Sequence, residues 1–251
     1  MPVLCTRSMG AAMATVVELR TAVALAGRFP ALSGVDLSVE AGEVVVVLGP
    51  NGSGKTSLLR TCAGLLNVSS GTAVVLGCDL REDRVAVRSR VGLLGHAAPL
   101  YDELSARENV RFATRALGYP TDRVDPALER LGLVGRLRRT PVGRLSAGQR
   151  RRVALAALVA RSPELWLLDE PHAGLDAAAR RLLGELVEEA ATGGAAVLLS
   201  SHEPDLSVPM ADRVVSLAGG TITSSSPGGR ATKLSVVDLP APLGAGGSNV
   251  A

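Results

Sequence analysis

The sequence has few aromatic residues and little excess charge, and both scarcities exclude a class of protein. Phe, Trp and Tyr together make up 2% of the 251 residues, and the formal net charge is only +3. Binding to nucleic acid by base stacking needs aromatic side chains on a basic surface, so the composition argues against nucleic acid as a partner. With 47% hydrophobic and 20% charged residues, the chain can still bury the core of a large α/β domain.

Cysteines and long apolar runs are scarce as well. Cys5, Cys62 and Cys78 are odd in number and lack the paired spacing of metal ligands, which predicts reduced thiols, mostly in the core, of a cytosolic protein. No uninterrupted apolar run approaches the roughly 20 residues that a membrane-spanning helix needs. We therefore expect that the chain does not cross a membrane by itself, although a partner could hold it there.

Both ends of the chain differ from its middle. Residues 1–15 are irregular and lack the apolar core of a secretory signal, which indicates either a disordered lead or a start codon assigned too early, with Met9 or Met13 as the alternatives. From Ser224 onward the chain is rich in Ser, Pro, Gly and Ala, which predicts a flexible tail over 224–251. A folded domain is expected over 16–223. Within it, a mostly helical block at about 96–161 interrupts two strand-rich parts and resembles an inserted subdomain.

An apolar run, Val44 to Leu48, is followed by a glycine-rich turn and by a segment with helical spacing. The turn reads Gly49-Pro50-Asn51-Gly52-Ser53-Gly54-Lys55-Thr56-Ser57. A strand, such a turn and a helix form the phosphate-binding P-loop, in which glycines let successive backbone N–H groups face one anion. Lys55 would reach the β- and γ-phosphates of a nucleotide, and the Thr56 hydroxyl would ligate Mg²⁺. A chance match is the weaker interpretation, because a strand and a helix flank the motif.

A second apolar run, Leu165 to Leu168, ends in Asp169 and Glu170. Open α/β sheets bind ligands at the carboxyl ends of their strands. An Asp there can hold Mg²⁺, and a Glu beside it can orient and deprotonate a water aimed at a γ-phosphate. Alone, the pair would more often be an acidic turn, but the P-loop upstream favours the functional interpretation.

A third motif, Leu145-Ser146-Ala147-Gly148-Gln149, precedes a helix. Ser146 and Gln149 fit a capping box, so the plain interpretation is a well-capped helix. In the functional interpretation, Ser146 and the free amides of the helix start bind a phosphate. Arg150, Arg151 and Arg152 follow, and they predict a solvated helix face or a partner contact.

Together with Asp176 in AGLD and His202 in SSH, these motifs stand in an order that resembles the ATP-binding subunit of ABC transporters over about residues 16–223. The resemblance implies an α/β fold of the ABC ATPase type: a P-loop NTPase core, RecA-like, with a mixed sheet, an antiparallel β part and an inserted α-helical subdomain. Short antiparallel strands are also what the alternating residues from Val16 to Glu43 predict.

By the same resemblance, the chain hydrolyses ATP with Mg²⁺. Glu170 would be the catalytic base, His202 would contact the γ-phosphate and help to hold the attacking water, and Asp169 would share the metal with Thr56. Two copies would pair head to tail, so that LSAGQ of each copy faces the P-loop of the other and Asp176 links the two sites.

LSAGQ resembles the family's LSGGQ signature with Ala147 in place of a glycine, and two other positions also depart from the family pattern. His96 stands about where family members carry a Gln that helps to ligate Mg²⁺ and connects the site to the membrane subunit. A histidine could do so only as the neutral imidazole, whose unperturbed pKa of about 6.5 makes the contact pH-sensitive. The aromatic residue that normally stacks on adenine is missing near Ala26, and Phe29 is the nearby candidate for this contact.

LLGH ending at His96, LSAGQ and LWLLDEPHAGLD together look most like the ATPase of the cytochrome c maturation heme exporter. That subfamily implies integral membrane permease subunits as partners at the cytoplasmic face of the cell membrane, and no direct heme binding by this chain, His172 included. Alternatives are an ABC ATPase of another exporter or a soluble ABC-type ATPase for iron–sulfur cluster assembly. DNA-repair members insert a long coiled coil that does not fit here, and a P-loop kinase would leave LSAGQ unexplained.

Overall fold

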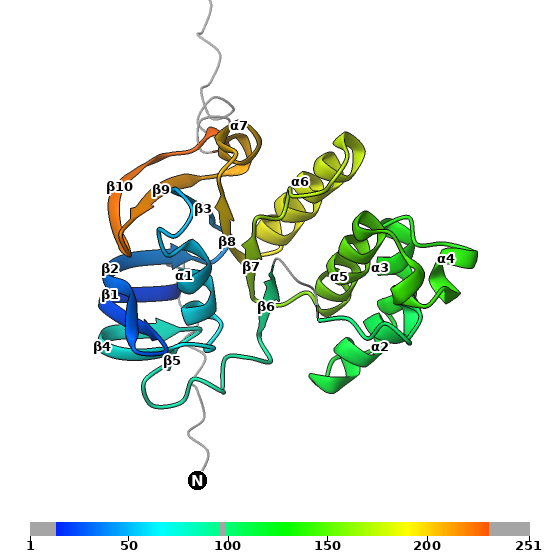
Figure 1. Cartoon of the computed structure of the whole chain (residues 1–251), viewed down its shortest axis with the longest axis horizontal. Helices are drawn as coiled ribbons and strands as arrows, with labels where there is room; N and C mark the ends of the chain where they lie inside the picture. Colours follow the sequence, from blue (N-terminus) through cyan, green and yellow to red (C-terminus); the bar gives the residue numbers. More distant parts are fainter. Residues whose placement is uncertain (1–13, 96–98, 231–251) are drawn as a thin grey trace, which may run out of the picture.

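Two β-sheets enclose helix α1 (Lys55–Cys62) in the computed structural model, which describes residues 14–95 and 99–230 (Figure 1). The first sheet is antiparallel, in the strand order β2-β1-β4-β5. Its strands are β1 (Thr15–Ala26), β2 (Phe29–Glu40), β4 (Asn67–Val75) and β5 (Cys78–Asp79). The alternating residues of β1 and β2 turn one face toward α1, as their pattern predicts.

The second sheet has six strands in the order β10-β9-β3-β8-β7-β6. Five of them are parallel, and the antiparallel strand β10 joins them at one edge. The strands are β3 (Val44–Leu48), β6 (Val91–Leu94), β7 (Leu165–Asp169), β8 (Ala196–Ser201), β9 (Arg213–Ala218) and β10 (Thr221–Pro227).

The parallel strands are apolar without alternation because both faces of the sheet are buried. In β3, Val45 and Val47 join the cluster around α1, whereas Val44 and Val46 join the cluster on the opposite face. That opposite face is covered by α5 (Ala147–Arg161) and α6 (Ala177–Thr192).

The remaining helices of the block between β6 and β7 gather at the end of the molecule away from the first sheet (Figure 1). They are α2 (Ala106–Ala116), α3 (Val124–Arg130), α4 (Arg136–Arg139) and the 3-10 turn η1 (Val142–Arg144). Two short turns, α7 (Pro204–Ser207) and η2 (Val208–Met210), precede β9. The mixed sheet, antiparallel part and helical insertion make up the fold class that the sequence predicts.

The helix starts follow their capping residues. Ser105 caps α2 and Ser146 caps α5, each in a reciprocal capping box with the residue three positions on. Asp176 caps α6 by accepting a hydrogen bond from the Ala179 amide at 2.7 Å. Among the helices described, none is long and apolar enough to cross a membrane.

The sequence analysis places the start of the flexible tail, at Ser224, too early. Ser224 to Pro227 belong to β10, whose backbone pairs with β9. Arg230 then forms ion pairs with Asp212 and, at 3.2 Å, with Glu188. Strand pairing with β9 therefore orders this polar stretch, although its composition is that of a linker. Residues 231–251 of the predicted tail and 1–13 of the predicted lead lie outside the described residues.

Candidate functional site

The loop between β3 and α1 is shaped by two glycines, Gly49 and Gly54, at which an added Cβ atom would clash with backbone. A Cβ atom on Gly49 would lie 2.2 Å from the Leu217 carbonyl oxygen of β9. At Gly54 the φ angle is +108°, and a Cβ atom would lie 2.8 Å from the Ala31 carbonyl oxygen of β2. The loop is therefore wedged between two other strands, and α1 starts at the next residue, Lys55.

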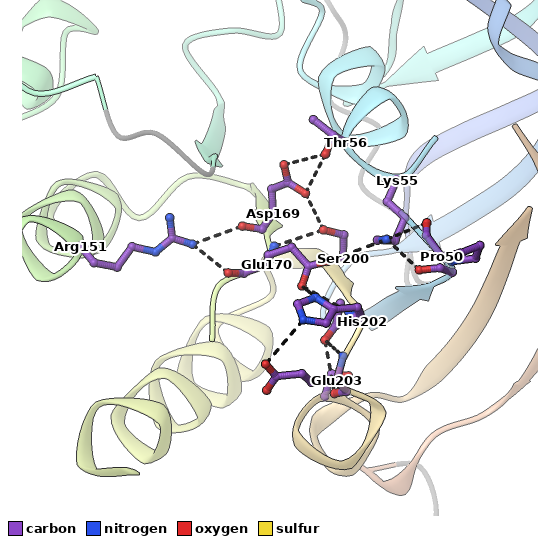
Figure 2. A network of polar contacts seen from close by, with 12 residues as sticks. Pro50, Lys55, Thr56, Arg151, Asp169, Glu170, Ser200, His202 and Glu203 are labelled. Carbon is purple, nitrogen blue, oxygen red and sulfur yellow. Dashed lines mark hydrogen bonds and ion pairs between the residues drawn. The ribbon is translucent and has the colours of Figure 1, made fainter. Parts of the chain in front are cut away.

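Lys55 points back into this loop (Figure 2). Its Nζ donates hydrogen bonds to the carbonyl oxygens of Gly49, at 2.8 Å, and Pro50, at 3.2 Å. The side chain is only 7% exposed, and the nearest carboxylate oxygen is Oε1 of Glu170 at 3.8 Å. A nearly buried ammonium group thus lies beside the amides of a helix start, which is the charge pattern that binds a phosphate chain.

Thr56 and Asp169 lie side by side where α1 begins and β7 ends. The Thr56 hydroxyl donates to Oδ2 of Asp169 at 2.9 Å, and the carboxylate is buried. A hydroxyl and a carboxylate beside a phosphate site are the hard oxygen ligands that suit Mg²⁺. In residues 14–95 and 99–230, no group of three His, Cys, Asp or Glu side chains could hold a metal ion.

Ser200 is a member of this cluster that the sequence analysis missed. It lies opposite Asp169 on the neighbouring strand β8, and its hydroxyl donates to Oδ1 of Asp169 at 2.6 Å. The same hydroxyl accepts the Glu170 amide at 3.2 Å, and Ser200 is fully buried. A polar residue at the end of an otherwise apolar strand was the available signal.

Glu170 and His202 are brought together from β7 and β8. Oε2 of Glu170 lies 2.7 Å from Nδ1 of the His202 ring and accepts the His202 amide at 3.2 Å (Figure 2). Glu170 also has a φ angle of +46°, a left-handed conformation that costs a residue with a side chain about 1–3 kcal/mol. This conformation and the histidine together direct the carboxylate toward the P-loop lysine.

The three arginines after LSAGQ do not share one role, and for Arg151 the prediction of a solvated or partner-facing side chain is wrong. Its guanidinium donates to the carbonyl oxygens of Gly95, Asp169 and Glu170 within the same chain. Burial lowers the pKa of this guanidinium from its usual value. Helix α5 passes close to the ends of β6 and β7. Arg151 lies on the side of that helix that faces these strand ends, so its guanidinium contacts both.

The LSAGQ motif and the P-loop stay apart within one chain. An open pocket of about 540 Å³ beside the P-loop is lined from β2, β7 and the β9–β10 turn. Ser146 and Ala147 lie in the helical block and are exposed. Asp176 caps α6 and lies 3.3 Å from the Arg152 guanidinium. Glu170, Asp169, Thr56 and Lys55 are therefore assembled in one chain, whereas of LSAGQ only Ser146 and Ala147 are exposed, and Leu145 is buried in the core.

Phe29 lies at the margin of the site. Phe29 is 80% exposed and precedes Pro30 and Ala31, which line the pocket. His96 lies outside the described residues. His172, close to Glu170 in sequence, is 5% exposed, and its ring nitrogens have no hydrogen-bond partner among the described residues. Its burial lowers the pKa of the imidazole.

Known proteins resemble the chain over most of its length. The family model described as ABC transporter matches residues 32–173. The cytochrome c biogenesis ATP-binding export protein CcmA of Bordetella bronchiseptica is 43% identical over 188 residues, which cover 73% of this chain and 83% of that protein. The daunorubicin resistance ATP-binding protein DrrA3 of Streptomyces coeruleorubidus is 40% identical over 196 residues, which cover 76% of this chain and 62% of that protein.

Solved structures agree with the fold. An ATP-binding subunit of an ABC transporter superimposes with a TM-score of 0.78 at 26% identity, covering 85% of this chain and 90% of that one. A dimeric bacterial ABC transporter cassette superimposes with a TM-score of 0.74 at 25% identity, covering 84% and 98%. With the P-loop, the Asp-Glu pair and the LSAGQ helix in place, the chain belongs to the ABC transporter family as an ATP-binding subunit that hydrolyses ATP.

Proposed function

We propose that two copies of this chain bind and hydrolyse ATP with Mg²⁺ between them, and that they drive a membrane permease which exports heme for cytochrome c maturation. The observation that carries the catalytic part is the cluster around the P-loop, where Lys55, Glu170 and the Thr56–Asp169 pair converge.

In this proposal the P-loop from Gly49 to Ser57 binds the phosphate chain. Lys55, now bonded to two loop carbonyls, would turn its ammonium group to the β- and γ-phosphates, because an anion attracts it more strongly than neutral carbonyls do. Thr56 and Asp169 would hold Mg²⁺, and the oxygen-rich pair they form fits that ion. When bound, the metal neutralises the charge that develops on the phosphates.

Glu170 is proposed as the general base. Its side chain is 21% exposed, so water can reach it, and His202 holds one of its oxygens at 2.7 Å. The carboxylate would orient a water against the γ-phosphate and accept its proton. His202 is itself 54% exposed and can contact the γ-phosphate from the other side of the same water.

The exposed Ser146 and Ala147 of LSAGQ support a head-to-tail dimer. Ser146 and the start of α5, a helix of 15 residues, would meet the γ-phosphate held by the partner's P-loop. Asp176 would link the two sites from the start of α6. Two solved structures of one neighbouring cassette are described as dimeric, one of them bound to ADP and Pi, and both are consistent with this pairing. Phe29 is the proposed contact for the adenine.

Heme export rests on the CcmA relatives, of which those in Bordetella, Cupriavidus and Paramagnetospirillum are 38–43% identical. We infer membrane permease partners and a place at the cytoplasmic face of the cell membrane. An exposed edge-to-face pair, Tyr101 and Phe112 with ring centroids 5.1 Å apart, borders an apolar pocket that such a partner could cover. The resemblance to a daunorubicin resistance protein keeps a different exporter as the second candidate.

Affinity capture of the full chain from membranes, solubilised in detergent, tests the transport part. We expect integral membrane proteins of cytochrome c maturation to be captured, and deletion of the gene to leave c-type cytochromes without heme. Drug sensitivity with normal cytochromes would favour the second exporter. Capture of soluble iron–sulfur scaffold proteins alone would overturn transport altogether.

A further inference from the structure

Arg151 joins helix α5 to the ends of two neighbouring strands. One guanidinium nitrogen donates to the carbonyl oxygen of Gly95, the residue after β6, at 2.6 Å. The other donates to the carbonyl oxygens of Asp169 and Glu170, each at 3.2 Å, at the end of β7 (Figure 2). One side chain from the helical block thus bridges the carboxyl ends of β6 and β7.

These contacts complete the restraint on the Glu170 backbone. On one side, the Glu170 amide donates to both the hydroxyl and the carbonyl oxygen of Ser200, each at 3.2 Å. On the other side, its carbonyl oxygen accepts from the Ala173 amide at 3.2 Å and from Arg151. A residue at φ +46° keeps its conformation only where the surroundings over-determine it, and Arg151 supplies the part of that restraint that comes from the helical block.

The chemistry of the side chain suits this task. Arg151 is a partly desolvated cation whose hydrogen-bond partners are three neutral carbonyls, and its Nε has no hydrogen-bond partner among the described residues. Removing a charged group from water so that it can bond with neutral acceptors adds little to the stability of the fold. A planar fork with several donors is, however, the group that can hold two strand ends at once, and neither Lys nor Gln has that geometry.

We propose that Arg151 is a positioning residue that sets the backbone of Glu170 from the LSAGQ helix, so that turnover depends on where the start of α5 lies relative to the sheet. Arg151 follows Gln149 by two residues, within the first turns of α5. Any shift of that helix start therefore moves the guanidinium, and with it the peptide that carries the base. The inference rests on the proposed role of Glu170.

The test compares Arg151→Gln and Arg151→Lys with a matched control, Arg161→Gln. Arg161 lies at the other end of α5, is also partly desolvated, and donates to the Val91 carbonyl oxygen at the start of β6 at 2.7 Å. Steady-state ATPase activity of the full chain gives kcat and KM, and equilibrium titration gives the affinity for ATP. The single tryptophan, buried Trp166, reports by its emission that the core is intact.

We expect Arg151→Gln to lower kcat about tenfold to a hundredfold, as a displaced catalytic group does, with KM and ATP affinity unchanged. Arg151→Lys should recover part of the lost kcat. Arg161→Gln should keep the wild-type kcat, although its thermal stability should fall by about as much as that of Arg151→Gln. A wild-type kcat in folded Arg151→Gln would overturn the proposal, as would an equal loss in Arg161→Gln. If neither Arg151 variant folds and Arg161→Gln does, the role is structural and the proposal also fails.

Glu170→Gln separates this inference from the function on which it rests. If that variant retains turnover, Glu170 is not the base, and the proposed function fails first. If it loses turnover while Arg151→Gln keeps a wild-type kcat, only the positioning role is wrong.

Discussion

Ser200 donates a hydrogen bond to Oδ1 of Asp169 at 2.6 Å across the boundary between β8 and β7. Thr56 donates to the other oxygen of the same carboxylate at 2.9 Å. Two hydroxyls from separate elements therefore fix the rotation of Asp169, the residue proposed to hold Mg²⁺. Its geometry is set before any metal binds, which reduces the reorganisation needed for binding.

Ser200→Ala should weaken Mg²⁺ binding without preventing it, because Asp169 would keep only the Thr56 contact. We expect half-maximal ATPase activity to need more Mg²⁺, and the free energy of unfolding to fall by about 1.5–3 kcal/mol, the usual value of a hydrogen bond to a charged group. Ser201→Ala is the matched control, since Ser201 is equally buried but, within the described part of the chain, its hydroxyl forms hydrogen bonds only with the backbone of Glu203. Equal Mg²⁺ requirements in both variants would contradict the assignment.

Glu170→Gln should lower turnover by about 10²–10⁴-fold, the typical contribution of a general base, while ATP still binds. Because ATP then persists, the variant should elute as a dimer with Mg²⁺ and ATP in size-exclusion chromatography. The His202 amide can still donate to the side-chain amide oxygen that replaces the Glu170 carboxylate, so the fold should be kept. Unchanged hydrolysis would remove Glu170 from its proposed role.

Lys55→Ala should weaken ATP binding by about tenfold to a hundredfold, which corresponds to losing one charge-assisted contact of about 1.5–3 kcal/mol. Calorimetric titration with ATP measures this change directly. Unaltered Trp166 emission would show that the loss does not come from unfolding. Affinity close to that of the wild type would count against the P-loop assignment.

His172 should make the protein less stable in mild acid. Its burial lowers the pKa below the usual value of 6.5, so the unfolded chain takes up a proton before the native protein does. The stability that depends on a neutral His172 is complete above pH 6.5 and is lost as the pH falls from there toward the lower native pKa. In His172→Leu, urea midpoints at about pH 7.5 and 5.5, on either side of that value, should therefore differ less than in the wild type. An identical difference would show that His172 does not contribute.

His96→Gln should change the pH dependence of ATP hydrolysis. A histidine in the place of the Mg²⁺-ligating Gln can act only when neutral, so wild-type activity should fall below about pH 6.5, whereas glutamine does not titrate. Rates measured from about pH 5.5 to 8 for both proteins test this expectation. If the two profiles coincide, titration of His96 has no role in turnover.

Much of the fold could be predicted because its signals are local. Whether a strand is buried on one face or on both can be read from its own residues, as in β1 and β3. Capping boxes at Ser105 and Ser146 depend on residues three positions apart. The P-loop carries its own geometry in its glycines, so the positions of Lys55 and Thr56 followed from the motif. Asp169 and Glu170 could be interpreted as functional residues only because a P-loop precedes them in the sequence.

The rest depends on which elements become neighbours. Ser200 and Asp169 are 31 residues apart, and only the pairing of β7 with β8 places them opposite each other. Arg150, Arg151 and Arg152 are identical in type, and each points about 100° away from the next around the helix. Only the seating of α5 against the sheet selects Arg151 for the strand ends. The sequence by itself determined the phosphate loop, the strands and the helix starts, whereas long-range packing decided which side chains restrain Asp169 and Glu170.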